Sequence, residues 1–286
     1  MPKAVCNGIT LHYQRQMAPG PDVVLVHGLA TSLAFWYLGV VPLLLHDFRP
    51  IVYDLRGHGQ SDMPASGYTT VDMAADLHGL LDHLEIRRAH LVGHSYGGAV
   101  ALHYTVLHPE RVASLTVADA RIPAFQPMLR PAAPHTKAHG WELFDPARAQ
   151  AGAEPEVNYR LLEDLAEAQV QGKQGQSAAL ARHAPFGASR MSTRTAERWL
   201  QLLRTTTARG EFEAVGPDLE TIGSVRQPVL AIFGEFSHCL PSCWGLKQRV
   251  PHCRVTIVPN AGHFHPIMRP AIFAGRLRAF LSYAAA

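Results

Sequence analysis

A serine framed by two glycines is the clearest sign of chemistry in this chain of 286 residues. The pattern Gly-x-Ser-x-Gly covers residues 93–97 and is centred on Ser95, between an apolar run at 89–92 and a helical pattern at 99–108. It predicts a nucleophile elbow, in which a strand turns sharply into a helix and exposes the serine at the apex. The flanking glycines avoid a Cβ clash. The following helix directs its free N–H groups toward the serine oxygen.

A serine hydroxyl is a useful nucleophile only when a base accepts its proton. Among the 17 histidines we select His263, because it follows the last expected strand and Gly262 before it suits a tight loop. His265 is the nearest competitor for this role. His94 adjoins the nucleophile, but its side chain is expected to point away from the Ser95 hydroxyl.

The acid that orients His263 has two candidates, because two expected strands end at a carboxylate. Asp119 follows the strand at 112–118, and Glu235 follows the strand at 228–233. We predict Asp119, which would receive the Nδ1 proton of His263 and stabilise the imidazolium. A helix cap or loop hydrogen bond is the alternative role for Asp119, and Glu235 is the second choice of acid.

Two backbone N–H groups are expected to stabilise the oxyanion that forms when the serine attacks a carbonyl. The N–H of Tyr96, directly after the nucleophile, is one donor. The N–H of Leu29, in the loop after the first buried strand, is the other. Both roles belong to the backbone, so the two side chains can serve other purposes.

Strands and helices alternate at short spacing through the first 122 residues. Asn7-Gly8 predicts an N-terminal hairpin. Buried strands are expected at 22–27, 50–54, 89–92 and 112–118, with helices at about 33–45, 69–84 and 99–108. This rhythm indicates an α/β fold with a mostly parallel sheet and helices on both faces. Functional groups in such folds gather beyond the carboxyl ends of the strands.

The rhythm breaks after Ile122 and returns with the strand at 228–233. The intervening stretch begins with a proline-rich run and contains helical patterns near 156–171, 176–183 and 193–207. We predict a core formed by residues 1–122 and 217–286, and a helical cap formed by residues 123–216. Candidates to line the underside of the cap are Trp141, Phe144, Phe186, Met191, Trp199 and Phe212.

Composition excludes several classes of protein. The net charge is +3 with scattered basic residues, which argues against binding of nucleic acid. No apolar run reaches the roughly 18–20 residues that span a bilayer. The first residues lack an apolar stretch of signal-peptide length, so we predict a cytoplasmic protein without a membrane span.

The cysteines also bear on the chemistry. An intracellular setting favours thiols for Cys6, Cys239, Cys243 and Cys253. Three of these thiols lie near His238 and His252, but the spacing matches no common zinc pattern. We therefore expect neither a metal nor another cofactor.

Four segments together resemble the α/β-hydrolase superfamily, in the branch of haloperoxidase-like esterases, epoxide hydrolases, haloalkane dehalogenases and carbon–carbon bond hydrolases. They are His27-Gly28, the Gly-punctuated loop 54–61, the serine segment 93–98, and Asn260-Ala261-Gly262-His263. The resemblance implies Ser95 as nucleophile, His263 as base and a helical cap over the site. Dehalogenases and epoxide hydrolases of this branch carry Asp at the apex, so Ser95 argues against both.

The resemblance departs from the family at one place. Many members carry Asp where this chain has Ser237, whereas some relatives place the acid after the preceding strand, as Asp119 lies here. We predict a cofactor-independent serine hydrolase that acts through an acyl-enzyme on a small, apolar carboxylic ester, thioester or lactone. The alternative is a lyase, cyclase or carbon–carbon bond hydrolase of a larger apolar metabolite. A non-catalytic ligand binder is the third hypothesis. The exact substrate and the oligomeric state are not encoded in these motifs.

Overall fold

The computed structural model describes residues 2–126, 157–172 and 191–285. Its centre is an eight-stranded sheet in the order β1-β2-β4-β3-β5-β6-β7-β8, parallel from β4 to β8. The prediction of a mostly parallel sheet is confirmed. The strands are β1 (Lys3–Cys6), β2 (Ile9–Arg15), β3 (Asp22–Val26), β4 (Arg49–Tyr53), β5 (Ala89–His94), β6 (Val112–Ala118), β7 (Val229–Gly234) and β8 (Cys253–Val258).

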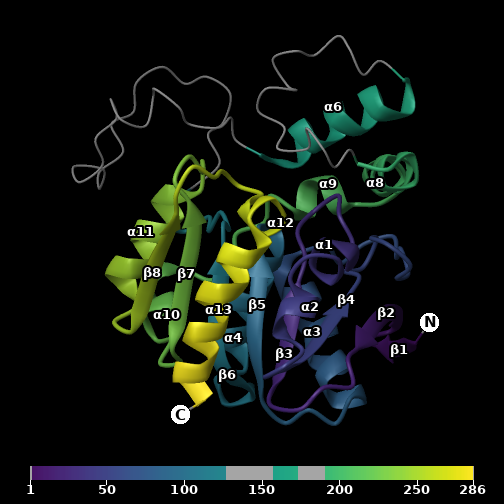
Figure 1. Cartoon of the computed structure of the whole chain (residues 1–286). Coiled ribbons are helices and arrows are strands. Elements are labelled where there is room, and N and C mark those ends of the chain that lie inside the picture. The colour runs from purple at the N-terminus through teal and green to yellow at the C-terminus, as the bar shows by residue number, and fades with distance from the viewer. Residues whose placement is uncertain (1, 127–156, 173–190, 286) are drawn as a thin grey trace.

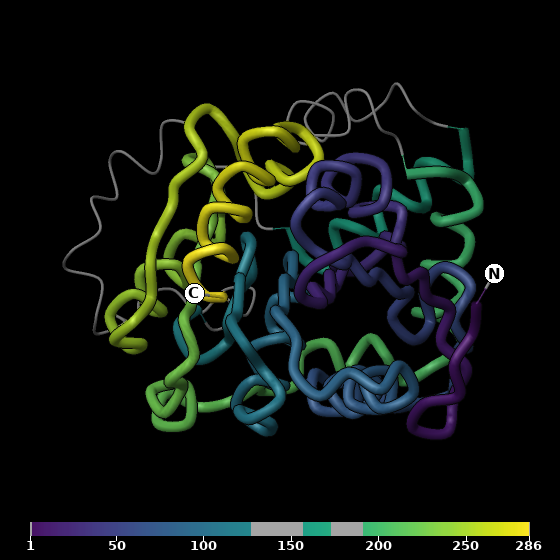
Figure 2. The backbone as a smooth tube through the Cα atoms, turned by 60° about the horizontal axis from the view of Figure 1, so that its bottom comes forward, coloured from purple at the N-terminus to yellow at the C-terminus, as the bar shows by residue number. Residues whose placement is uncertain are grey.

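The two N-terminal strands form the predicted hairpin. Asn7 and Gly8 have φ values of 48° and 76°, the left-handed backbone that a tight two-residue turn requires. β2 then pairs antiparallel with β4 and joins the hairpin to the parallel part of the sheet. Figure 1 and Figure 2 place this hairpin and β8 at opposite sides of the molecule.

Helices cover both faces of the sheet, and each layer has its own apolar cluster. Trp36 and Phe273 are among the fully buried side chains of one layer. That layer contains α1 (Ala34–Tyr37), α2 (Val41–Leu44), α12 (His265–Met268) and α13 (Pro270–Ala285). The other contains α3 (Thr70–His83), α4 (Tyr96–Leu107), α10 (Leu219–Gly223) and α11 (Leu240–Arg249), and the 3-10 turn η1 (Pro109–Arg111) follows α4.

The single helix predicted for 33–45 is wrong, because the structure has two short helices there. α1 ends at Tyr37, and α2 begins at Val41. Gly39 lies between them, and Pro42 occupies the first turn of α2, where it lacks the N–H that would continue a helix from α1. The prediction of that helix relied on Trp36, Val40 and Leu44, which are spaced four residues apart, and all three are fully buried.

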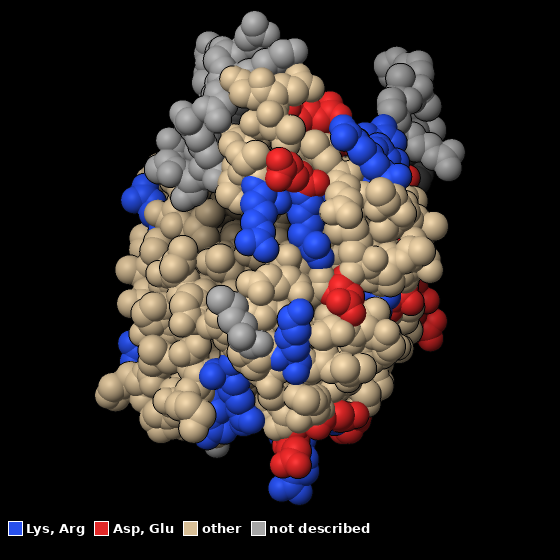
Figure 3. All heavy atoms as spheres, turned by 90° about the vertical axis from the view of Figure 1, so that its right-hand side faces the viewer, with Lys and Arg blue, Asp and Glu red and all other residues tan. Residues whose placement is uncertain are grey.

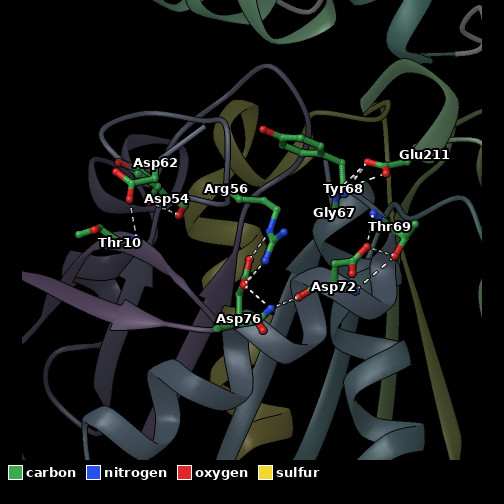
Figure 4. A network of polar contacts seen from close by, with 12 residues as sticks. Thr10, Asp54, Arg56, Asp62, Gly67, Tyr68, Thr69, Asp72, Asp76 and Glu211 are labelled. Atoms are coloured by element: carbon green, nitrogen blue, oxygen red, sulfur yellow. Dashed lines mark hydrogen bonds and ion pairs between the residues drawn. The ribbon is translucent and has the colours of Figure 1, made fainter. Parts of the chain in front are cut away.

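Three described helices of the expected cap lie together at one end of the sheet in Figure 1: α6 (Tyr159–Val170), α8 (Thr193–Thr205) and α9 (Ala208–Glu211). The carboxylate of Glu211 accepts hydrogen bonds from the backbone N–H groups of Gly67, at 3.0 Å, and Tyr68, at 2.7 Å. Figure 4 shows this contact beside the buried Arg56–Asp76 ion pair, which ties the same loop region to α3. Charge-assisted hydrogen bonds thus fasten α9 to the loop that precedes α3.

Several predictions about the cap lie outside the described residues. They concern Trp141, Phe144, Phe186 and the helical pattern at 176–183. No helix among the described residues is long and apolar enough to cross a membrane. On the face drawn in Figure 3, basic and acidic side chains are interspersed and form no continuous basic strip.

Candidate active site

Ser95 occupies a strained turn between β5 and α4. Its φ of 55° and ψ of −127° lie where non-glycine residues are seldom found, and α4 begins at the next residue. A Cβ on Gly93 would collide with the backbone of Gly97, and a Cβ on Gly97 would collide with the carbonyl of His27. This is the strand–turn–helix geometry expected of a nucleophile elbow, and it explains the spacing of the glycines.

Asp119 follows β6 at the same edge of the sheet, and its carboxylate has a partner on each side. Oδ2 accepts the N–H of Gly234 at 2.7 Å and lies 2.8 Å from Nε2 of His265. Oδ1 accepts the hydroxyl of Ser237 and lies 3.6 Å from Nδ1 of His263. Burial alone would raise the pKa of Asp119, but the two histidines lower it well below its ordinary range. The group is therefore an anion at neutral pH.

His263 is held in place from several directions. Its side chain is almost fully buried, and its backbone carbonyl accepts a hydrogen bond from Nε2 of His94 at 2.9 Å. The ring of His94 stacks on Phe35, with centroids 4.5 Å apart, and its centroid is 4.8 Å from that of His263. Burial holds the pKa of His94 well below its ordinary value. His94 is thus a neutral group that positions the loop carrying His263.

The structure separates the two carboxylates considered for the acid. Glu235 is exposed, and its side chain accepts the backbone N–H of Asn260 at 2.8 Å. Asp119 is fully buried and faces His263. The 3.6 Å separation exceeds a hydrogen bond, but such contacts commonly tighten when substrate binds. Only Asp119 of the pair is placed to orient His263.

Two histidines position the loop that contains Leu29. Nε2 of His27 accepts the N–H of Leu55 at 3.0 Å, so Nδ1 carries the proton and donates to the carbonyl of Gly28 at 2.7 Å. Nε2 of His58 likewise accepts the N–H of Ala30 at 3.2 Å. Burial lowers the pKa of both rings, that of His58 to about 3, so both are neutral.

This loop comes close to Ser95. A Cβ on Gly28 would lie 2.8 Å from the Cβ of Ser95, a distance that only glycine permits. Leu29, Ser95 and Tyr96 line one cavity of about 70 Å³. The backbone donors predicted for an oxyanion therefore belong to residues gathered around Ser95.

The same cavity receives side chains from the region expected to form the cap. Tyr159 of α6 and Phe212, directly after α9, line it together with Cys239. Phe212 stacks on Trp199, with ring centroids 5.7 Å apart, and Trp199 lines a second cavity of about 220 Å³. Met191 packs against the larger apolar cluster. Of the described candidates for the cap underside, Phe212 is the one that borders the serine.

Sequence reasoning missed two partners of Asp119. Ser237 was noted for the carboxylate that it lacks, and here its hydroxyl donates to Asp119. His265 was considered as a competing base, whereas it lies against the opposite oxygen of Asp119. The only signal in the sequence was position: Ser237 comes three residues after the end of β7, and His265 comes two residues after His263. It does not specify which carboxylate they contact.

Comparison with curated proteins gives partial matches. "Putative carbamate hydrolase RutD" of Stutzerimonas stutzeri (strain A1501) is 41% identical over 115 residues, covering 38% of this chain and 43% of that relative. "Epoxide hydrolase 3" of Siraitia grosvenorii is 37% identical over 111 residues, covering 38% of this chain and 35% of that relative. The matches therefore span less than half the length of these relatives.

Solved structures match over nearly the whole chain, and because the sequence identities are low, the likeness shows the fold alone. Carboxylesterase CesB of Bacillus subtilis has a TM-score of 0.74 at 20% identity and covers 98% of this chain and 90% of its own. Est816, described as an N-acyl homoserine lactone degrading enzyme, has a TM-score of 0.67 at 24% identity, covering 98% and 100%. A family model for the alpha/beta hydrolase fold matches residues 21–270. The chain belongs to the α/β-hydrolase fold family.

Proposed function

We propose that this protein is a cofactor-independent serine hydrolase that acts on a carboxylic ester, thioester or lactone. The observation that carries the proposal is the convergence of three strand ends. Ser95 stands at a strained apex after β5, Asp119 is buried after β6, and His263 follows β8 with its Nδ1 facing that carboxylate. Such a constellation makes an alcohol nucleophilic at neutral pH.

In the first half-reaction, Nε2 of His263 takes the proton of Ser95 while the serine oxygen attacks the carbonyl carbon. The anionic Asp119 stabilises the imidazolium and keeps the Nδ1 proton on its own side of the ring. The N–H groups of Leu29 and Tyr96 receive the oxyanion. His263 then returns the proton to the departing alcohol or thiol, leaving an acyl group on Ser95.

In the second half-reaction, a water molecule takes the place of the leaving group. His263 removes its proton as the oxygen attacks the acyl carbon, and the resulting oxyanion occupies the same two N–H groups. Collapse of this intermediate releases the acid and returns the proton to Ser95. No step requires a metal or a bound cofactor.

The cavity favours a small, apolar acyl group. Its volume is about 70 Å³, and its lining includes Leu102, Ile122 and Phe212. Est816 and an enol-lactonase of Burkholderia xenovorans share the fold, which makes lactones suitable first substrates. A larger metabolite, as in the lyase, cyclase or carbon–carbon hydrolase alternative, would need the cap to move.

A fluorophosphonate probe tests the nucleophile directly. We expect the wild type to be labelled and to hydrolyse a short p-nitrophenyl ester, and Ser95→Ala to be unlabelled with a rate lower by about 10⁶-fold. Ser114→Ala is a matched control, since that buried serine lies in β6 away from the elbow. Absence of labelling in correctly folded wild type would contradict the proposal.

A further inference from the structure

We propose that His238, Cys239 and His263 form an inhibitory binding site for zinc or a similar thiophilic divalent cation. The site lies on the Nδ1 side of the His263 ring. The site goes beyond the proposed hydrolase activity, and only its inhibitory effect rests on that activity. It is built from two loops, because His238 and Cys239 follow β7 and His263 follows β8.

The three side chains are already close enough to share one ion. Sγ of Cys239 lies 3.2 Å from Nε2 of His238 and 3.9 Å from Nδ1 of His263. One ligand atom from each residue lies within 4.8 Å of the other two. Zn–N bonds of about 2.0–2.1 Å and Zn–S bonds of about 2.3 Å place tetrahedral ligands about 3.3–3.6 Å apart. Side-chain shifts of an ångström or less would close the site.

The ligand set has the chemistry that zinc prefers. Two imidazoles and a thiolate match the mixed nitrogen and sulfur sites in which zinc is tetrahedral, with the fourth position left for water. Cys239 and His263 are almost fully buried, and Nδ1 of His238 is a buried atom without a hydrogen-bond partner. The group is therefore mostly buried, with His238 as its partly exposed member.

Charges around the cluster both oppose and favour a cation. The positive charge of Arg121 acts on His238 and disfavours a cation there. The N–H of Val157 donates to Nε2 of His238 at 3.3 Å, and a metal ion on this nitrogen would replace that hydrogen bond. The anionic Asp119 lies 3.6 Å from Nδ1 of His263. A Cys239 thiolate together with the Asp119 carboxylate balances the two charges of the ion, so binding releases one proton, that of the thiol.

Metal binding at Nδ1 would disable the base. In the working enzyme Nδ1 of His263 carries a proton and Nε2 offers its lone pair to Ser95. A metal on Nδ1 requires that nitrogen to be deprotonated, so the ring proton moves to Nε2. The ring then has no lone pair to accept the serine proton. Asp119 also loses the N–H that it orients.

Cobalt(II) spectroscopy tests the site without any assay of activity. We expect one equivalent of Co²⁺ to give a thiolate-to-metal charge-transfer band in metal-free wild type, with Zn²⁺ displacing it. Cys239→Ser should abolish the band. His238→Asn removes a ligand and should weaken Zn²⁺ binding, measured by calorimetry, by more than about 100-fold. Loss of a hydrogen-bond partner of a ligand costs only roughly 10- to 100-fold in affinity.

Cys243→Ala is the matched control, because this buried thiol lies one helical turn further along α11. It should keep the cobalt band. Absence of a band in wild type would overturn the proposal. The proposal would also be overturned if Cys239→Ser bound one equivalent of Zn²⁺ as tightly as wild type, because the ion would then lie elsewhere. Circular dichroism verifies the fold of each variant.

Inhibition is measured as the rate of fluorophosphonate labelling, each variant against its own metal-free rate. Zn²⁺ should slow labelling of wild type at least tenfold, reversibly with a chelator, and should have no such effect on Cys239→Ser. Metal binding without slower labelling would overturn the inhibitory role. Wild type that never reacts when metal-free would instead contradict the proposed hydrolase, while the cobalt band would still decide the metal site.

Discussion

Two buried carboxylates follow parallel strands of the sheet and pair with histidine, yet only one lies at the edge of the sheet that carries the proposed nucleophile. Asp54 follows β4, and its Oδ2 lies 2.6 Å from Nδ1 of His12. Asp119 follows β6 and lies 2.8 Å from Nε2 of His265 and 3.6 Å from Nδ1 of His263. Both carboxylates are almost completely buried.

The two groups differ in what else they hold. Asp54 accepts backbone N–H groups from Leu33, at 2.7 Å, and Gln60, at 2.9 Å, so it fastens two loops to the end of β4. His12, on β2, contributes a further contact. Asp119 also accepts a backbone N–H, from Gly234, but it faces two imidazoles, one of which belongs to the loop after β8.

A buried aspartate–histidine pair is therefore no sign of catalysis by itself. The pair at Asp54 stabilises loops, whereas the pair at Asp119 lies at the edge where β5 ends in Ser95. Position relative to the elbow is what distinguishes Asp54, which holds loops, from Asp119, which we propose to be catalytic. The same substitution at the two sites tests this distinction. Asp119→Asn should lower activity, whereas Asp54→Asn should lower stability.

The largest difference is expected from Asp119→Asn. An amide cannot hold the Nδ1 proton of His263 as a carboxylate does, so kcat should fall about 10⁴-fold. Steady-state kinetics on a short ester measures the loss, and KM should change little. A fall of less than tenfold would favour a Ser–His pair that needs no acid, and with it the lyase or cyclase alternative.

Asp54→Asn should show the reverse pattern. Its NH₂ group would face one of the backbone N–H donors that the carboxylate now accepts, and an unsatisfied buried donor costs about 1–3 kcal/mol. Urea unfolding should show that loss of stability, while kcat stays within tenfold of wild type. A fall of kcat as large as that of Asp119→Asn would refute the distinction between the two sites.

His265→Asn probes how much the second imidazole contributes to the acid. Without it Asp119 keeps the Gly234 N–H, the Ser237 hydroxyl and His263 as partners. We expect kcat to fall about tenfold, less than the roughly 100-fold that an ångström of misplacement can cost. His265→Gln, with a longer amide, should recover part of the rate if positioning is the cause. Equal rates for both variants would argue against it.

Much of this arrangement follows from local sequence patterns. The elbow was evident because the glycine spacing has a steric reason, and Asp119 was selected because it follows a buried strand. In the sequence, only Gly39 and Pro42 indicate the break between α1 and α2. A single helix was predicted because the apolar residues on both sides of the break keep helical spacing. Local patterns therefore locate strand ends better than they locate breaks between short helices.

Contacts between distant loops were beyond such reasoning. His12 and Asp54 meet because β2 pairs antiparallel with β4, and Ser237 and His265 meet at Asp119 because β6, β7 and β8 are neighbours. Strand order decides these encounters, and no residue pattern specifies it. The cluster of His238, Cys239 and His263 has the same origin, which is why zinc-type spacing along the chain did not indicate it.

The smallest effect concerns a buried imidazole that pairs with a hydroxyl in place of a carboxylate. His90 on β5 lies 2.7 Å from Oγ of Ser114, and burial, with the charge of Arg88, lowers its pKa to about 4. Between pH 6.5 and about 4 the unfolded chain binds a proton at this residue that the folded chain does not. This contribution to stability is therefore complete above pH 6.5 and declines as the pH falls toward 4.

His90→Gln should flatten that decline by up to about 1.4 kcal/mol per pH unit. The measurement is the free energy of unfolding in urea at a series of pH values, compared with wild type. Asp119 adds slope only at the acid end of this window, because a carboxylate whose pKa is lowered in the folded chain loses its stabilising effect as the pH falls below about 5. The effect of His90→Gln is therefore compared with wild type above that pH. An unchanged slope in His90→Gln would mean that this imidazole becomes protonated in the folded chain as readily as in the unfolded one.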